Sequence, residues 1–208
     1  MATQFPSLAQ VLAADSSALR ETPVSQEVLV QGKFLRMVRD TVTQTNGKTA
    51  TREYIQHPGA VVIVPILEDG RVLVEYQYRH ALGGMFLEFP AGKIDPGEDH
   101  WRCATRELLE ETGLRAQEWA YAGQMHNCIG YSDEFIGIWF ARGMQQGMQA
   151  LEEGELLHLG AATPQELLTA MRNGQLTDAK TLTCMLWLQQ LLDGGWQPEW
   201  QTLQEQPA

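Results

Sequence analysis

The segment between Gly92 and Leu114 constrains the fold of this 208-residue chain more than any other part of it. It begins at the turn signal Pro90-Ala91-Gly92 and contains a second turn signal, Asp95-Pro96-Gly97. The residues after this second turn predict a helix from Asp99 to Thr112. On a wheel of about 100° per residue, apolar side chains form one stripe of this helix and glutamates form another. We therefore expect one face of the helix to pack and the acidic face to be exposed.

The packing stripe consists of Trp101, Ala104 and Leu108, and the acidic stripe of Glu107, Glu110 and Glu111. Like charges within one turn destabilise a helix, so a cation should lie beside the acidic stripe. Arg106 is close enough in sequence to hold or orient some of these carboxylates. Carboxylates with no His or Cys on the same face favour Mg²⁺ or Mn²⁺ over zinc. A glutamate-rich face that is simply solvated is the alternative interpretation.

The spacing of this segment resembles the Nudix box without a departure. It reads Gly92, five residues, Glu98, seven residues, then Arg106-Glu107-Leu108-Leu109-Glu110-Glu111-Thr112-Gly113-Leu114. The resemblance implies an α+β fold, an α/β/α Nudix sandwich with a mixed sheet. It also implies that Glu107 and Glu111 are the principal metal ligands, that Glu110 and the Ala91 carbonyl share the ions, and that Glu98 assists beside them. Mg²⁺, which Mn²⁺ can replace, would then orient a water for in-line attack at phosphorus.

The sequence around the box resembles the ADP-ribose and ADP-sugar pyrophosphatase branch of this family. The matching stretches are Tyr76 to Arg79, Glu88 to Asp95, Asp178 to Thr181 and an N-terminal hairpin. The resemblance implies hydrolysis of ADP-ribose, or a related nucleoside diphosphate sugar, to AMP (or another nucleoside monophosphate) and a sugar phosphate. It makes Arg79 a candidate phosphate contact and Glu134 a candidate substrate-binding residue, although a surface ion pair is the alternative for both.

One position departs from the pattern of that branch, because Ile129 stands where a proline is expected, ahead of Ser132-Asp133-Glu134. This departure keeps other nucleotide sugars open, including GDP-mannose, as well as dinucleotide cofactors and flavin nucleotides. A Nudix-fold ligand sensor without catalysis is a third hypothesis. It is disfavoured because such a module is expected to lose carboxylates from the box, and all of them are present.

The first part of the chain predicts a small antiparallel β subdomain, residues 1–57, ahead of a Nudix domain at residues 58–208. A short helix is expected at Leu8 to Leu12 and strands at Val28 to Val42 and Thr49 to Ile55, with a hairpin turn at Asn46-Gly47. Two hairpin strands alone bury little apolar area. We therefore expect a homodimer in which this subdomain packs against the partner.

The second part predicts strands at residues 61–67, 72–78, 86–89, 119–125 and 135–141. A capping box at Thr163 should start a helix that stops near Gly174, and a last helix should run from about Asp178 to Leu192. The stretch between Ala141 and Thr163 is expected to be a loop.

That loop contains the acidic segment Leu151-Glu152-Glu153-Gly154-Glu155. In the branch that the chain resembles, a mobile acidic loop at this place carries the glutamate that activates water. The resemblance points to Glu153 as this catalytic residue, with Glu152 and Glu155 as alternatives, beside the box residues Glu110 and Arg106. A solvated acidic loop is the plainer interpretation.

The charge of the chain opposes binding to nucleic acid, because 15 Lys and Arg face 26 Asp and Glu, for a net charge of −11. Its three cysteines have no disulfide or zinc spacing. The first 25 residues do not resemble a signal peptide, and no apolar stretch is long enough to span a bilayer. We therefore expect a cytoplasmic protein that binds a small molecule and no membrane.

Overall fold

The structure is a computed structural model that describes residues 5–151 and 153–202. The chain divides into two compact units, Met1–Gln56 and His57–Ala208. Each unit has its own sheets, and each is described separately here.

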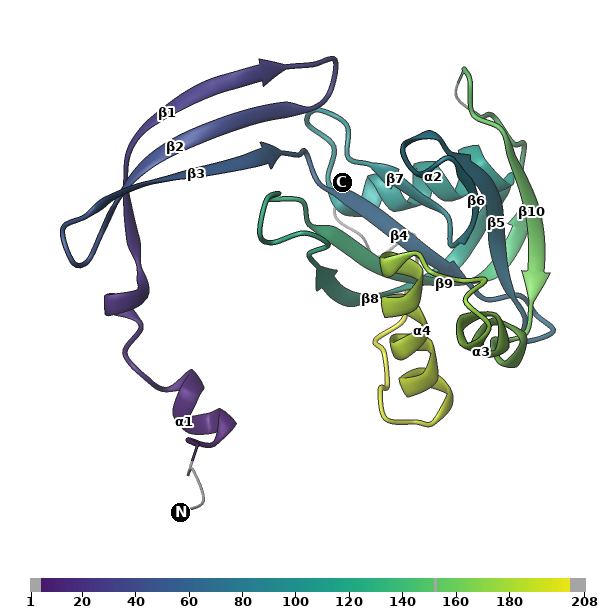
Figure 1. Cartoon of the computed structure of the whole chain (residues 1–208). Coiled ribbons are helices and arrows are strands. Elements are labelled where there is room, and N and C mark those ends of the chain that lie inside the picture. Colours follow the sequence, from purple (N-terminus) through teal and green to yellow (C-terminus); the bar gives the residue numbers. More distant parts are fainter. Residues whose placement is uncertain (1–4, 152, 203–208) are drawn as a thin grey trace. The chain divides into compact units, whose positions relative to one another are not determined.

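The first unit is a three-stranded antiparallel sheet in the order β1-β2-β3, preceded by a short helix (Figure 1). Its elements are α1 (Leu8–Leu12), the 3₁₀ turn η1 (Ser17–Leu19), β1 (Glu21–Gln31), β2 (Arg36–Gln44) and β3 (Thr49–Gln56). The hairpin predicted at Asn46-Gly47 joins β2 to β3, and Gly47 takes a φ of +78° there. The predicted short helix and the antiparallel character of this region are confirmed.

The prediction of one strand from Val28 to Val42 is wrong, because the chain reverses between β1 and β2. The Gly32 N–H donates to the Leu35 carbonyl at 2.8 Å and closes this turn. Apolar residues alternate on both sides of the turn, so the strand pattern continues through it, and no Asn-Gly pair marks it. The unit therefore has three strands in its described residues, 5–56, of which only Val38 and Val42 are buried core residues.

The second unit contains a five-stranded mixed sheet in the order β11-β8-β9-β4-β7. Its strands are β4 (Ala60–Pro65), β7 (Ala91–Lys93), β8 (Leu114–Met125), β9 (Ile136–Gln146) and β11 (Gln201–Thr202). β4 pairs in parallel with β9, and the other pairs are antiparallel. Every residue of β4 is buried, as its apolar sequence predicts for a central strand.

A second sheet of this unit has the order β10-β5-β6 and is antiparallel. It consists of β5 (Val72–Arg79), β6 (Gly84–Glu88) and β10 (Leu157–Ala162), with the 3₁₀ turn η2 (His80–Leu82) between β5 and β6. β10 lies in the stretch predicted to be a loop, and β9 runs on to Gln146, so that expectation is wrong for both ends. The strand forms because it pairs with β5, whose partner residues lie 80 to 90 positions earlier in the sequence.

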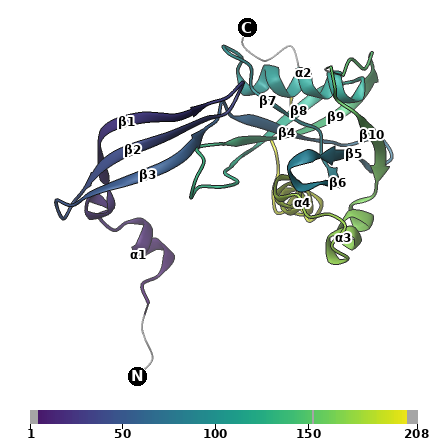
Figure 2. The same ribbon diagram turned by 45° about the horizontal axis from the view of Figure 1, so that its top comes forward.

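Helices cover both faces of the mixed sheet (Figure 2). α2 (His100–Thr112) lies on one face, and α4 (Ala179–Leu192), with α3 (Pro164–Arg172) beside it, lies on the other. Each face has its own apolar core, one with Phe140 and Leu188 beneath α4 and one with Leu108 and Trp119 beneath α2. The predicted α+β sandwich with a mixed sheet is confirmed.

The core beneath α2 contains a cluster of three tryptophans. Trp101 and Trp119 have ring centroids 5.0 Å apart, Trp101 and Trp139 5.2 Å, and Trp119 and Trp139 6.3 Å. Trp101 comes from the helix and the other two from β8 and β9, so the cluster joins α2 to the sheet.

In the described part of the chain, no helix is both long enough and apolar enough to cross a bilayer.

Candidate active site

The turn between β7 and α2 and the two ends of α2 are set by local sequence. Asp99 caps the helix by accepting a hydrogen bond from the Arg102 N–H at 2.9 Å, and Gly113 ends it with a φ of +69°. Gly92 lies against the helix so closely that a Cβ there would be 1.8 Å from the carboxylate of Glu107. Glycine is required at this position because any side chain would overlap the Glu107 carboxylate.

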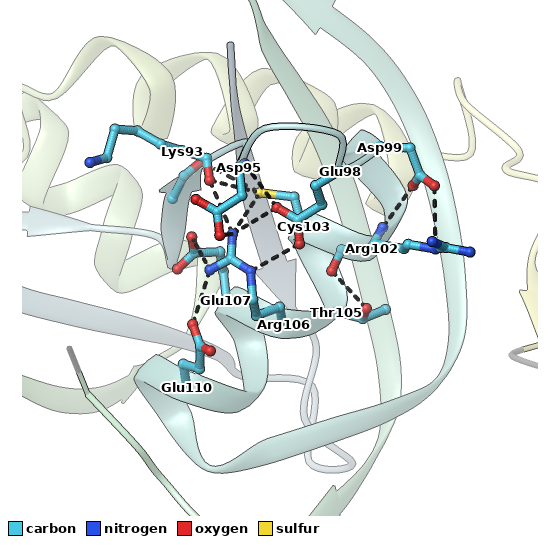
Figure 3. Close-up of polar contacts among 11 residues, drawn as sticks. Lys93, Asp95, Glu98, Asp99, Arg102, Cys103, Thr105, Arg106, Glu107 and Glu110 are labelled. Carbon is cyan, nitrogen blue, oxygen red and sulfur yellow. Dashed lines mark hydrogen bonds and ion pairs between the residues drawn. The ribbon is translucent and has the colours of Figure 1, made fainter. Parts of the chain in front are cut away.

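Arg106 is the cation that the acidic stripe requires (Figure 3). Its guanidinium donates two hydrogen bonds of 2.9 Å to Glu98, one of 2.8 Å to Glu107 and one of 3.0 Å to Glu110. A further bond of 3.1 Å goes to the Lys93 carbonyl. These partners raise the pKa of Arg106, and the guanidinium in turn holds the pKa of Glu98 below its usual range.

Two of the three glutamates of the acidic stripe are buried, so the expectation of an exposed stripe is wrong for them. Glu107 is 9% exposed and Glu111 is 4% exposed, because β7 packs against this side of the helix, whereas Glu110 is partly exposed. Burial raises the pKa of Glu107 to about 7, since a low-dielectric surrounding disfavours the charged carboxylate. Burial and the neighbouring carboxyls of Glu75 and Glu107 raise the pKa of Glu111 further. A divalent cation would reverse this charge balance.

Glu111 accepts a hydrogen bond of 3.0 Å from the Ala91 N–H, which joins the helix to the turn. The Ala91 carbonyl, rather than its amide, is the group predicted to share the metal, and this role stays a prediction. Glu75 of β5, whose charge reaches Glu111, is a site residue that the sequence analysis missed. Its signal was a charged residue that directly follows the apolar run Val72 to Val74 of a strand.

Arg79 lies at the end of β5 and forms two hydrogen bonds, 2.8 and 2.7 Å long, with the buried carboxylate of Glu88. Lys180 of α4 forms an ion pair with Glu88 and another with Asp178. The Arg79 side chain is 44% exposed, and Glu111 is close enough to affect its pKa. The network of Glu88 and Lys180 was missed, although both lie in stretches that resemble the pyrophosphatase branch.

Glu134 lies apart from the acidic stripe in the part of the chain that the structure describes. Its carboxylate is 3.6 Å from Nδ1 of His57, and its backbone bonds with Ser132 and His126. The structure does not bring Glu134 together with Arg106 or Glu111. Its predicted contact with substrate therefore depends on a substrate that extends beyond the helix.

The acidic loop before β10 approaches the helix through Glu155. The charge of Glu155 raises the pKa of both Glu107 and Glu111. Glu153, the residue predicted to activate water, is exposed on the same loop. Glu152, the other alternative, lies outside the described residues.

No three His, Cys, Asp or Glu side chains within the described ranges already surround a common point. The reason is that Arg106 and the Ala91 amide now bond the carboxylates that a cation would share. The residues nevertheless fit a divalent ion of the Mg²⁺ type. The donor set consists of oxygens, Gly92 makes room for Glu107, and both oxygens of the buried Glu75 lack a hydrogen-bond partner among the described residues.

The NUDIX domain family matches residues 56–183 of the sequence. The chain belongs to the Nudix family. The match spans the box, the strands from β4 to β10, α2, α3 and the start of α4, so every predicted ligand of this Nudix site falls within it.

Curated relatives extend the similarity of this Nudix chain over most of its length. It is 32% identical over 171 residues to a methanol dehydrogenase activator from Bacillus methanolicus, covering 81% of this chain and 92% of that protein. It is 29% identical over 174 residues to an ADP-ribose pyrophosphatase from Bacillus subtilis, covering 83% and 94%. An ADP-ribose pyrophosphatase from Mycobacterium tuberculosis is 38% identical over 124 residues, covering 59% and 60%.

The fold of this Nudix chain is similar to that of a solved structure described as an ADP compounds hydrolase. The TM-score is 0.77 at 21% identity, and the match covers 87% of this chain and 98% of the other. The prediction of a Nudix enzyme that hydrolyses pyrophosphate is confirmed at the level of the family.

Proposed function

We propose that this chain hydrolyses the pyrophosphate of ADP-ribose, or of a related nucleoside diphosphate sugar, in a Mg²⁺-dependent reaction. The products are AMP, or another nucleoside monophosphate, and a sugar phosphate. The observation that carries the proposal is the group of Glu107, Glu110 and Glu111 on one helix face, where Glu107 and Glu111 are buried and Arg106 bonds to Glu107 and Glu110. Relatives named ADP-ribose pyrophosphatase support the substrate class.

Glu107 and Glu111 would hold the divalent ion, together with Glu110 and the Ala91 carbonyl. The bound ion would supply charge neutralisation for the diphosphate and a Lewis acid at the reacting phosphorus. Arg106 keeps Glu107 and Glu110 oriented, and Glu98 anchors the other side of the guanidinium. The helix therefore presents its carboxylates in fixed positions.

Arg79 would bind a phosphate of the substrate. Its bidentate bond to Glu88 fixes the guanidinium, while 44% of the side chain stays exposed to a ligand. Lys180 neutralises part of the Glu88 charge, so more of the positive charge of Arg79 is available to bind an anion.

A loop glutamate would take the proton of the attacking water, because carboxylates that bind metal are poorer proton acceptors. Glu153 is our first assignment. Glu155 is the second candidate, and its electrostatic effect on Glu107 and Glu111 favours it.

The subdomain of residues 1–57 would pack against a partner copy in a homodimer. Its sheet carries large apolar side chains that are exposed in the single chain, namely Val24, Val28, Val30, Phe34 and Leu35. Exposed apolar groups in such number favour burial at an interface.

Ile129 bears on substrate choice rather than on folding, because its side chain is 84% exposed. It stands beside the Ser132-Asp133-Glu134 stretch that we assign to substrate. GDP-mannose and dinucleotide cofactors are therefore the alternative substrates, and a ligand sensor is the alternative function.

A panel of nucleoside diphosphate compounds, assayed with Mg²⁺, Mn²⁺ or EDTA, tests the proposal. Chromatography should show AMP and ribose 5-phosphate from ADP-ribose, with turnover abolished by EDTA. Faster turnover of GDP-mannose or a dinucleotide would reassign the substrate. Binding of these compounds without any turnover would favour the sensor.

A further inference from the structure

Glu75, at the centre of β5, is buried completely, with 0% of its surface exposed. Neither of its carboxylate oxygens has a hydrogen-bond partner among the described residues. A buried carboxyl without partners is costly to keep, and such groups in proteins normally pair with a cation, a donor or a metal ion. The buried carboxyl of Glu75 therefore needs a cation or a hydrogen-bond donor as its partner.

The cations nearest to Glu75 are engaged elsewhere. Its cross-strand neighbour Glu88 takes the hydrogen bonds of Arg79 and Lys180. These two cations only partly offset burial, which raises the pKa of Glu75 above its ordinary value. Two cations thus bond to the carboxylate of Glu88, whereas neither of them bonds to Glu75 on the adjacent strand.

The side chain that faces Glu75 from the other layer is Glu111, a ligand in the proposed metal site. The charge of Glu75 raises the pKa of Glu111, and the contact with the Glu111 carboxyl lowers the pKa of Glu75, which places the two groups in one electrostatic cluster. Glu111 belongs to α2 and Glu75 to β5, so the two acids approach from different elements. No cation of the described chain bonds to either of them.

We propose that Glu75 is an additional carboxylate of the divalent-cation site and binds, from β5, the ion that Glu111 binds from α2. The inference rests on the proposed function, because it assumes that α2 holds a divalent ion. The box supplies ligands from one turn and one helix only. Glu75 adds a ligand from the second sheet, so that the ion joins this sheet to the helix. Its two oxygens then have a partner of opposite charge, which none of the described residues provides.

Metal binding by the full chain tests the inference, with Glu75→Gln as the main variant because it removes the charge and keeps the shape. Calorimetric titration with Mn²⁺ should show affinity weakened by about 10-fold or more. The rise in melting temperature on adding Mg²⁺ should shrink in parallel, since a weaker ligand stabilises less. Glu118→Gln is the matched control, because it removes one charge from an exposed pair with Arg142 and should bind Mn²⁺ like the wild type.

Unchanged Mn²⁺ affinity in Glu75→Gln would overturn the inference and leave the proposed function standing. A wild-type chain that binds neither Mn²⁺ nor Mg²⁺ would overturn both. If Glu75→Gln does not fold, Glu75→Asp replaces it, because this variant keeps the charge and withdraws the carboxylate by one methylene. Weaker Mn²⁺ binding by Glu75→Asp supports the inference, and wild-type binding overturns it.

Discussion

The carboxylate of Glu88 forms an ion pair with Lys180 across 92 positions of sequence, and both side chains are nearly buried. The pair joins β6 to α4, and Arg79 adds two more hydrogen bonds to the same carboxylate. Burial opposes the charge of Glu88, but Arg79 and Lys180 outweigh burial and lower its pKa below the ordinary 4.5. Folding is thus coupled to the ionisation of this one group.

This coupling predicts an acid limb in the stability profile. A carboxyl with a lowered pKa stabilises the fold above pH 4.5, and that contribution is lost as pH falls through the lower, folded-state pKa. Glu88→Gln should cost about 3 kcal/mol at neutral pH, because Arg79 loses its partner and Lys180 keeps only Asp178, and it should flatten the limb. Urea denaturation at several pH values measures both effects. Glu118→Gln, in an exposed pair, should cost less than about 1 kcal/mol.

Gly92→Ala should damage metal binding more than folding. The added Cβ would lie 1.8 Å from the Glu107 carboxylate, which is the free end of a side chain and can move away. We expect the melting temperature of the metal-free protein to stay near wild type and Mn²⁺ affinity to fall by about 10-fold or more. Gly160→Ala is the control, because its Cβ would meet only Val74 at 3.7 Å. Equal affinity in the two variants would contradict the packing argument.

Glu107→Gln and Glu111→Gln should each lower kcat by at least about 100-fold. Neither should destabilise the metal-free protein at alkaline pH. For Glu107, whose pKa rises from 4.5 to about 7, the stabilising effect of the neutral acid is present below pH 4.5 and is lost as pH rises through about 7. Thermal melts in EDTA and kinetics at saturating Mg²⁺ test the two statements. Near wild-type turnover at limiting Mg²⁺ would remove that residue from the ligand set.

Glu153→Gln should lower kcat by about 10² to 10⁴-fold, leave Mn²⁺ affinity unchanged and remove the acid limb of the pH–rate profile. Glu155→Gln, from the same loop, is the matched comparison. If Glu155→Gln shows these effects and Glu153→Gln does not, the proton acceptor is Glu155. Wild-type kcat in both variants would show that a group other than Glu153 or Glu155 accepts the proton of the attacking water.

Light scattering during size-exclusion chromatography should give twice the chain mass. A chain that lacks residues 1–57 should elute as a monomer, because the exposed apolar side chains of β1 and of the turn that follows it are then gone. A full-length chain that is monomeric at assay concentration and fully active would refute the dimer.

Most elements governed by local sequence could be predicted. Asp99, Gly113 and the capping box at Thr163 act within a few residues of themselves, and the two helices that they bound begin and end within two residues of their predicted limits. Helical periodicity likewise places the box glutamates on one face, and the resemblance to the Nudix box implies their role as metal ligands.

Features that depend on distant pairing could not be predicted. β10 is a strand because β5 lies beside it, and Glu107 is buried because β7 covers it. Glu88 and Lys180 meet across 92 positions, and Glu75 reads as an ordinary strand residue until α2 is placed above it. A single sequence carries no record of such contacts, and tertiary context overrides the local pattern.

The tryptophan cluster beneath α2 gives this helix a fluorescence signal. Trp101 moves with the helix, whereas Trp119 and Trp139 belong to the sheet, and the rings are 5.0 to 6.3 Å apart. Excitation absorbed by one indole is shared among the three, so a small shift of α2 alters the emission of the whole group. Intrinsic fluorescence can therefore follow the helix in real time as an ion or a nucleotide arrives, without any attached label.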